Sequence, residues 1–366
     1  MVRFVFILLF CCAVLFFFLH AVKEGVRKDL AQPVVSQLSS EDTPTPFFEK
    51  QKKGIKKESL FVPYWAVPEV TLPGTYTTYI YFGVTPGQDG LFVDEPGSQQ
   101  IDAFLSVVPE QKEKLLTLRM VDNQNNLTVL KSDRLQQKII EQTLSLVKEK
   151  GFDGVVLDLE LSALPFDSLV NQISSFTAKF STQTSQQKKT FVVTLYGDAF
   201  YRVRPFDVKK IAQHADRVMI MAYDFHKARS NPGPNFPLHG EELYGYDLTK
   251  MSNDFLQTMP ADKINVIFGY FGYDWLVDSK GNAIAQATPV TENEIEQRFL
   301  HGCNFADCVI KRDQISSETN ITYTDDAKRK HSVWFEDKKS IQAKQSFLQE
   351  RGINTFSYWA YSYFDN

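Results

Sequence analysis

Two carboxylates at the end of one apolar segment are the first residues in this sequence that could do chemistry. The segment GFDGVVLDLE, residues 151–160, gains charge near its end, at Asp158 and Glu160. If the segment is a β-strand, these two side chains project from one face, because side chains alternate along a strand. Two close carboxyl groups in partly dry surroundings cannot both ionise easily, so one can keep a proton and act as a general acid. Glu160 suits the role of the acid, and Asp158 suits the role of its partner. The alternative interpretation is that the two carboxylates are only solvated charges at the end of the strand.

Other kinds of site lack their usual signatures. The chain contains no G-x-S-x-G, H-E-x-x-H, Walker or G-x-G-x-x-G motif. Its six histidines are scattered, and His226 and His239 lack the spacing of metal ligands. We therefore expect no metal and no cofactor. A formal net charge of -4 leaves no basic footprint for nucleic acid, and we expect no nucleic-acid partner.

The carboxylates must be positioned by a series of β-rich segments that alternate with helical ones. Helices are expected between strands, for example at residues 133–150 and 205–215, where apolar residues recur at helical spacing. This alternation predicts an α/β protein, and eight strands are the number that closes a TIM (β/α)8 barrel. Asp158 and Glu160 would then lie at the barrel mouth, where such enzymes have their active sites. The expected strands are residues 59–65, 75–84, 114–121, 151–160, 189–197, 216–224, 263–272 and 353–361.

The chain of 366 residues is longer than a barrel of about 250 residues requires. Residues 276–334 break the alternation of strand and helix, and they hold a turn, a helical stretch and short strand-like pieces. We expect them to form a small α+β insertion between the seventh strand and the last helix. Cys303 and Cys308 within it could form a disulfide or remain packed thiols.

The N-terminal part of the chain has a different composition. From Phe4 to Val22 there are 19 uncharged residues, which as a helix would cover roughly 28 Å, close to the hydrocarbon thickness of a bilayer. Residues 1–22 are therefore expected to be a membrane anchor, or a signal segment if they are cleaved. Residues 23–58 are rich in Gln, Ser, Pro, Lys and Glu and are expected to form a flexible polar linker. The catalytic domain would be residues 59–366, outside the cytoplasm.

The carboxylate segment resembles a signature of glycoside hydrolase family 18, the chitinase-like family. The family pattern D-x-x-D-x-D-x-E is matched through Asp153, Asp158 and Glu160. Val156 stands where the family's second acid is usual, although the spore-germination subgroup often has a non-acid there. The resemblance to that cortex-lytic N-acetylglucosaminidase subgroup covers roughly Phe61 to the C-terminus, without the LysM repeats that such enzymes often carry.

Two further motifs lie in register with the first. Residues 218–226, VMIMAYDFH, are similar to the family's M-x-Y-D motif through Met221, Tyr223 and Asp224. FSYWAY near the C-terminus supplies Trp359, similar to the tryptophan that floors a sugar subsite in the family. Each interval between the motifs, without the insertion, is long enough for two strand and helix units. The resemblance implies that Met221, Asp224 and Trp359 contact the substrate.

The resemblance also implies a mechanism. In this family the substrate's own 2-acetamido group takes the place of an enzymic nucleophile, and the anomeric configuration is retained. Glu160 would act as acid and then as base, Asp158 would orient the acetamido N–H, and Tyr223 would donate to the acetamido oxygen. Asp153 would support the base of the motif. The implied partner is a polysaccharide that contains N-acetylglucosamine. The sequence does not decide between peptidoglycan and chitin as substrate or between endo and exo action, and it leaves the oligomeric state open.

Aromatic residues elsewhere could line further sugar subsites. Phe271 stands where relatives usually have tyrosine, and it is left outside the expected site. The alternative functions are a catalytically silent carbohydrate-binding barrel, such as a chitinase-like lectin, and a purely structural envelope protein. Such lectins usually lose the acid at the position of Glu160, so its presence favours hydrolysis. The aromatic candidates are Tyr64, Trp65, Tyr81, Tyr273 and Trp275.

Overall fold

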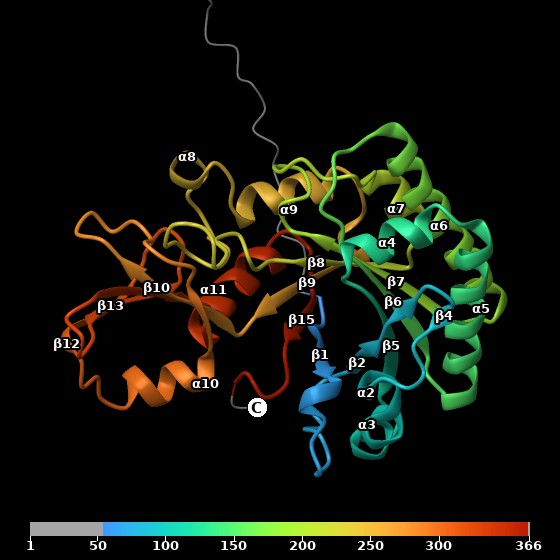
Figure 1. Ribbon diagram of the computed structural model, residues 1–366, viewed down its shortest axis with the longest axis horizontal. Coiled ribbons are helices and arrows are strands. Elements are labelled where there is room, and N and C mark those ends of the chain that lie inside the picture. Colours follow the sequence, from blue (N-terminus) through green and yellow to red (C-terminus); the bar gives the residue numbers. More distant parts are fainter. Residues whose placement is uncertain (1–53, 365–366) are drawn as a thin grey trace, which may run out of the picture. The chain divides into compact units, whose positions relative to one another are not determined.

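The structure is a computed structural model that describes residues 54–364 (Figure 1). Eight parallel strands form its centre: β1 Lys57–Pro63, β2 Thr78–Val84, β5 Glu113–Met120, β6 Gly154–Leu159, β7 Thr190–Tyr196, β8 Arg217–Met221, β9 Ile264–Gly269 and β15 Thr355–Trp359. They close into a barrel in the order β1-β15-β9-β8-β7-β6-β5-β2. Each strand overlaps one of the eight predicted segments, and the predicted TIM (β/α)8 barrel is confirmed.

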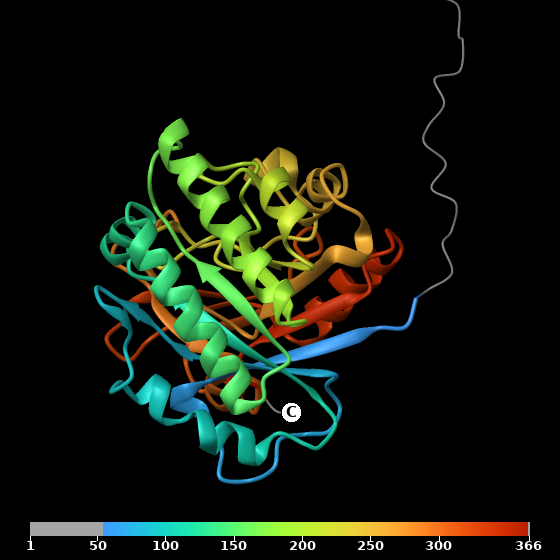
Figure 2. The same cartoon turned by 90° about the vertical axis from the view of Figure 1, so that its right-hand side faces the viewer.

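Helices cover the outside of this barrel. The two longest, α5 and α6, lie side by side (Figure 2). Short elements also lie beside some strands: the 3-10 turn η1 Tyr64–Ala66 after β1, the two-stranded ribbon of β3 Pro86–Gly87 and β4 Gly90–Leu91 after β2, and the 3-10 turn η2 Ala261–Lys263 before β9. The helices are α2 Pro96–Gln99, α3 Ile101–Val107, α4 Asn123–Leu130, α5 Asp133–Lys150, α6 Asp167–Gln186, α7 Val208–His214, α8 Glu241–Tyr244, α9 Leu248–Leu256 and α11 Lys338–Gln349.

The helix α5 illustrates how the sequence fixes the position of the strand that carries the carboxylates. The hydroxyl of Ser132 caps its start by accepting the N–H of Leu135 at 3.3 Å. Gly151 ends it with a φ of 74°, a left-handed conformation that glycine adopts without strain. The strand β6 begins three residues later. The apolar face of α5 is buried against the barrel through Leu135, Ile139, Ile140, Leu144 and Val147.

The barrel interior is filled by side chains from alternate positions of the strands, as in other packed barrels. Val156 is among them and is fully buried, so the position of the family's second acid is part of an apolar layer. Asp158, two residues further along β6, points into the same interior nearer the mouth. This interior layer consists of Phe61, Ile80, Phe82, Leu115, Val156, Val192, Met219, Met221, Ile267 and Ala360.

An antiparallel sheet with order β11-β10-β14-β13-β12 lies between β9 and α11, which confirms the predicted insertion between the seventh strand and the last helix. The sheet begins at Phe271, directly after β9, and ends at Phe335, whereas the predicted boundaries were 276 and 334. It appears in orange and red in Figure 1. Its elements are β10 Phe271–Val277, β11 Thr288–Thr291, α10 Glu292–Ile295, the π-helical turn η3 Glu296–Leu300, β12 Ala306–Arg312, β13 Thr319–Thr324 and β14 Lys330–Phe335.

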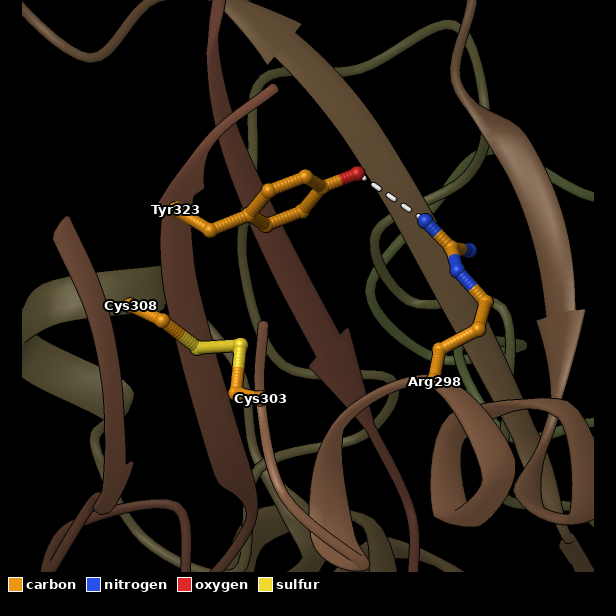
Figure 3. Close-up of a disulfide and its surroundings, with 4 residues drawn as sticks. All are labelled: Arg298, Cys303, Cys308 and Tyr323. Atoms are coloured by element: carbon orange, nitrogen blue, oxygen red, sulfur yellow. Dashed lines mark hydrogen bonds between the residues drawn. A yellow bond between two sulfur atoms is a disulfide. The ribbon is translucent and has the colours of Figure 1, made fainter. Parts of the chain in front are cut away.

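Cys303 and Cys308 form a disulfide in the insertion (Figure 3). Of the two states that the sequence left open, the structure has the bonded one. The disulfide ties the segment after η3 to β12, beside the apolar cluster of the insertion. Next to it, Arg298 donates a hydrogen bond to the hydroxyl of Tyr323 at 2.9 Å, which links η3 to β13 (Figure 3).

The predicted N-terminal anchor or signal segment, residues 1–22, lies outside the described residues, as does most of the predicted linker at 23–58. The last residues of that linker are described, and β1 already begins at Lys57. Within residues 54–364, no helix combines the length and the apolar character that crossing a membrane requires.

Candidate active site

The two candidate catalytic carboxylates lie at the C-terminal end of β6. Asp158 is inside that strand, and Glu160 follows its last residue. The backbone N–H of Glu160 donates to the carbonyl of Met120 at 2.9 Å, which extends the pairing of β6 with β5 beyond the strand. Because the two carboxylates are two residues apart on an extended chain, both point to the barrel interior at its mouth.

Asp158 is almost completely enclosed, with a relative exposure of 4%. The hydroxyl of Thr194 on β7 donates to its Oδ1 at 2.6 Å. Burial and, to a smaller extent, the charge of Glu160 raise the pKa of Asp158 to about 7, although Thr194 and Arg119 oppose the shift. A carboxyl group with such a pKa exchanges its proton near neutral pH.

Glu160 lies in a similar environment but is less enclosed. The hydroxyl of Tyr196, at the end of β7, donates to its Oε2 at 3.2 Å. Burial raises the pKa of Glu160, while the hydrogen bond from Tyr196 and the positive charges of Lys227 and Arg204 lower it. The balance is an upward shift, so the pair of carboxyl groups can hold a proton at a pH where exposed carboxylates are ionised.

Tyr223 and Asp224 directly follow β8, the barrel strand that lies beside β7. Burial raises the pKa of Tyr223 well above its ordinary value, so its hydroxyl remains a donor. Within residues 54–364 this hydroxyl has no hydrogen-bond partner, which leaves it available to a ligand. Its ring lies 5.7 Å from the ring of Phe271.

Asp224 is held in an unusual backbone conformation, with a φ of 61°. Its N–H donates to Oδ1 of Asn235 at 2.7 Å, and its Oδ1 accepts the hydroxyl of Tyr273 at 2.6 Å. Burial raises the pKa of Asp224, while Tyr273 and Lys227 lower it. A non-glycine residue with positive φ has to be fixed by its surroundings, and these two hydrogen bonds fix it.

An aromatic floor lies opposite the carboxylates. Trp359, the last residue of β15, packs with ring-centre distances of 4.6 Å to Phe82 and 5.7 Å to Phe61. Met221, at the end of β8, is buried beside it. A flat apolar face of this kind suits the apolar face of a sugar ring.

These groups surround two adjoining hollows at the mouth. The larger has a volume of about 190 Å³ and the smaller one of about 60 Å³. Four residues border both: Glu160, Met221, Tyr223 and Asp224. The larger is also lined by Phe61, Phe82, Asp158, Thr194, Ile267, Phe271 and Trp359. The smaller is also lined by Tyr196, Gly197, Asp198, Arg204 and Lys227. Within residues 54–364, no three His, Cys, Asp or Glu side chains are placed to hold a metal ion together.

The structure places two predicted site residues elsewhere. Asp153 precedes β6, about 16 Å from Asp158 at the ordinary rise per residue, and its Oδ2 accepts the N–H of Lys114 at 2.8 Å. It therefore joins the starts of two strands and does not belong with the catalytic groups. Tyr81 is fully buried on the outer side of β2, where its hydroxyl donates to the carbonyl of Gly97 at 2.6 Å. The alternation of side chains puts its neighbour, Phe82, in the cavity instead.

Four aromatic candidates remain. Trp275 is fully buried and lines neither hollow. Tyr273 contacts Asp224 through its hydroxyl and lines neither hollow. Tyr64, in η1, packs edge-on against Trp65 at 4.9 Å and also lines neither. Trp65 does not line them either, but its ring centre lies 6.4 Å from that of Trp359, which lines the larger hollow.

Several residues of the site were missed by the sequence analysis. Phe271, which was left outside the site, lines the larger hollow. Thr194 and Tyr196 donate to the two carboxylates, and their signal was present in the sequence. They are two residues apart at the end of β7, which pairs with β6 in parallel register, so they face the same interior as Asp158 and Glu160.

Comparisons with known proteins show what this chain resembles. The sequence profile described as "Glycosyl hydrolases family 18" matches residues 61–363. A cortical fragment-lytic enzyme of Bacillus anthracis is 25% identical over 302 residues, which cover 78% of this chain and 64% of that protein. The chain spans between 33% and 64% of the length of the first curated relatives it matches.

Solved structures share the fold. The spore cortex-lytic enzyme SleL of Bacillus cereus superposes with a TM-score of 0.64 at 20% identity and covers 85% of this chain and 72% of its own. A class V chitinase from Nicotiana tobaccum superposes with a TM-score of 0.70 at 13% identity, with coverages of 85% and 95%. At such identities the likeness shows the fold alone.

Proposed function

The chain belongs to family 18 of the glycosyl hydrolases, and we propose that it is a glycosidase that cleaves β-1,4 linkages next to N-acetylglucosamine. The substrate would be peptidoglycan or a chitin-like glycan. The observation that carries this proposal is the position of Glu160, which borders a cavity together with Asp158 and Tyr223, over the ring of Trp359. Relatives named as cortical fragment-lytic enzymes and as a chitotriosidase support the same substrate class.

The first step would be substrate-assisted. With N-acetylglucosamine in the larger hollow, its acetamido carbonyl oxygen attacks the anomeric carbon, and the bond from that carbon to the bridging oxygen breaks. Glu160 gives its proton to the leaving oxygen. Asp158 accepts a hydrogen bond from the acetamido N–H and stabilises the positive charge of the resulting oxazolinium ion. Tyr223 donates to the acetamido oxygen.

The second step would return the enzyme to its starting state. Glu160, now ionised, takes a proton from a water molecule, and the oxygen of that water attacks the anomeric carbon. The bond between this carbon and the acetamido oxygen breaks, so the acetamide is restored. Because both attacks occur with inversion, the product keeps the β-configuration.

The proposal can be tested with residues 54–366, a fragment that keeps the whole of β1. Wild type and Glu160→Gln would be incubated with purified peptidoglycan and with chitin oligosaccharides, and products would be identified by mass spectrometry. New reducing ends at N-acetylglucosamine from wild type alone, with a β-anomer seen first by NMR, support it. Binding without turnover by wild type, or release of the α-anomer first, contradicts it.

We also propose that the barrel works outside the cytoplasm, attached through residues 1–22 to the membrane or released after their cleavage. This proposal depends on the uncharged run from Phe4 to Val22 alone. Fractionation of the source cells followed by immunoblotting tests it. Protein found with intact residues 1–22 in the cytoplasmic fraction would contradict it.

A further inference from the structure

The smaller hollow beside Glu160 contains positive side chains that the proposed hydrolysis does not use. Arg204 and Lys227 line this hollow, and neither lines the larger one. Both come from loops that follow barrel strands, Arg204 from the loop after β7 and Lys227 from the loop after β8. Both are close enough to Glu160 to lower its pKa.

Arg204 is held rigidly. Its Nε and Nη2 donate to Oδ1 of Asp198 at 3.0 and 2.7 Å, and its guanidinium carbon lies 3.8 Å from the ring centre of Tyr196. The side chain is only 12% exposed. In the part of the chain that the structure describes, its Nη1 has no hydrogen-bond acceptor. The guanidinium is therefore fixed with one nitrogen available.

Lys227 is less constrained. Its Nζ lies 3.9 Å from Oδ2 of Asp224, beyond hydrogen-bond distance, and the side chain is 46% exposed. The ammonium can therefore receive another acceptor without losing an existing hydrogen bond. Arg202 adds a further positive charge, because it shares the carboxylate of Asp198 with Arg204. Arg202 does not line the hollow itself, but with it three cations are placed against the two carboxylates Asp198 and Asp224 while Glu160 carries its proton.

The position of Glu160 between the hollows indicates which sugar each would hold. In the proposed reaction the N-acetylglucosamine lies over Trp359, with its acetamido group at Asp158, and both residues line the larger hollow only. The acid has to reach the bridging oxygen, so this oxygen lies at the border. The leaving sugar then extends toward Arg204 and Lys227.

We propose that Arg204 and Lys227 form an anion-binding subsite for a carboxylate carried by the leaving sugar. This inference rests on the proposed function and narrows its substrate. In N-acetylmuramic acid, the lactyl group is attached to the carbon next to the one that bears the scissile oxygen, so its free carboxylate would be near the border. Guanidinium and ammonium groups both suit a carboxylate. The chain would then prefer peptidoglycan glycan strands without attached peptides to neutral chitin.

The test separates binding from turnover by using the Glu160→Gln variant. Its affinity would be measured by calorimetry for a tetrasaccharide of alternating N-acetylglucosamine and N-acetylmuramic acid, and for the same glycan with its carboxylates converted to methylamides. We expect the charged glycan to bind about tenfold more tightly. Adding Lys227→Gln or Arg204→Gln should bring this ratio close to one, while Lys209→Gln, an exposed lysine on α7, should not change it.

The ratio of the two affinities cancels any effect of a substitution that changes the binding of both glycans equally, such as a displacement of Tyr196 or Asp224. If Arg204→Gln does not fold, Lys227→Gln decides, because this lysine is half exposed. Equal affinity for the two glycans, no binding of either, or a preference that survives Lys227→Gln overturns the subsite. If the variants behave as expected but wild type cleaves neither glycan, the subsite is supported and the proposed hydrolysis is wrong.

Discussion

Two pairs of largely enclosed carboxyl groups within residues 54–364 differ in their surroundings. Within the described chain, Asp158 and Glu160 at the barrel mouth receive side-chain hydrogen bonds from hydroxyl groups alone. Glu318 and Glu336, where the insertion meets α11, both accept a hydrogen bond from Nζ of Lys344. The three side chains of this second group are fully enclosed, whereas the mouth pair borders a cavity.

The two pairs differ in the groups from which their carboxylate oxygens accept hydrogen bonds. Glu318 also accepts the N–H groups of Asn235 and Phe236, at 2.5 and 2.8 Å, so its charge is satisfied by the chain itself. Burial raises the pKa of Glu336 to about 8, although Lys344 opposes the shift. The mouth pair has no such cation and keeps acceptors free toward the cavity. A buried carboxylate that is paired by the chain destabilises the fold once its cation is removed, whereas one left unpaired at a cavity is available for chemistry.

The largest effect should come from the mouth. Replacing Glu160 with Gln removes the proton donor, and we expect kcat/KM on the preferred glycan to fall by about 10²–10⁴-fold. The midpoint of thermal unfolding at pH 8 should not fall. The reason is that the raised pKa of Glu160 makes its ionised form unfavourable in the folded state, and this cost disappears in the variant. A large fall in this midpoint would mean that Glu160 stabilises the fold, and the proposed contrast with the carboxyl pair bound to Lys344 would then be wrong.

Replacing Lys344 with Met tests the other pair. Two enclosed carboxyl groups then lack their cation, and we expect the free energy of unfolding to fall by about 3–5 kcal/mol near neutral pH. The loss should shrink at pH 5, because the enclosed carboxyl groups of the variant can take up protons at little cost when the pH is near the ordinary pKa of glutamate. Urea unfolding at pH 5 and pH 8 measures this. Lys339→Met, on the exposed side of the same helix, is the matched control, and an equal loss in both variants would refute the role of the lysine.

A smaller effect is expected from Asn235, which connects the two regions. Its N–H is bound by Glu318, and its side chain accepts the N–H of Asp224 and donates to the carbonyl of Phe271 at 3.0 Å. In Asn235→Ala we expect the free energy of unfolding to fall by about 1–3 kcal/mol. We also expect kcat/KM to fall about tenfold, because Asp224 loses a contact that fixes its backbone. Asn253→Ala, an exposed position on α9, should change neither quantity.

The barrel and its mouth could be predicted from the sequence because their signals are local. Runs of apolar and β-branched residues marked all eight strands, and apolar residues at helical spacing marked α5. Alternation along β6 placed Asp158 and Glu160 on one face. The same rule, applied to β2 and β7, would have replaced Tyr81 with Phe82 and added Thr194 and Tyr196.

The buried group under the insertion had no such signal. Glu318 and Lys344 are separated by 83 and 109 residues from Asn235, to whose backbone Glu318 is bound. Their contact depends on how the insertion folds back on the barrel, which hydrophobic periodicity does not determine. The insertion itself was found from a break in the alternation, so its position was predicted while its first strand was assigned partly to the barrel.

The smallest effect should be a shift in the pH dependence of activity, and it concerns the hydroxyl donors of the mouth. The hydrogen bond from Tyr196 lowers the pKa of Glu160, because it stabilises the ionised form. In Tyr196→Phe this stabilisation is lost, so Glu160 keeps its proton to a higher pH. The alkaline limb of the kcat/KM profile, where the carboxyl pair loses the proton needed for acid catalysis, should move upward by about half a pH unit to one.

The direction of this shift distinguishes the two ways of burying a carboxylate. If the mouth pair were matched internally, as the insertion's glutamates are, removing one hydroxyl would lower stability without moving the profile. A downward shift, or none, would therefore mean that Tyr196 does not act on the protonation of Glu160. Tyr201→Phe serves as the control, because the hydroxyl of Tyr201 makes no hydrogen bond within residues 54–364 and its ring stacks on Tyr246, away from the carboxylates. Only the Tyr196 variant should shift the alkaline limb.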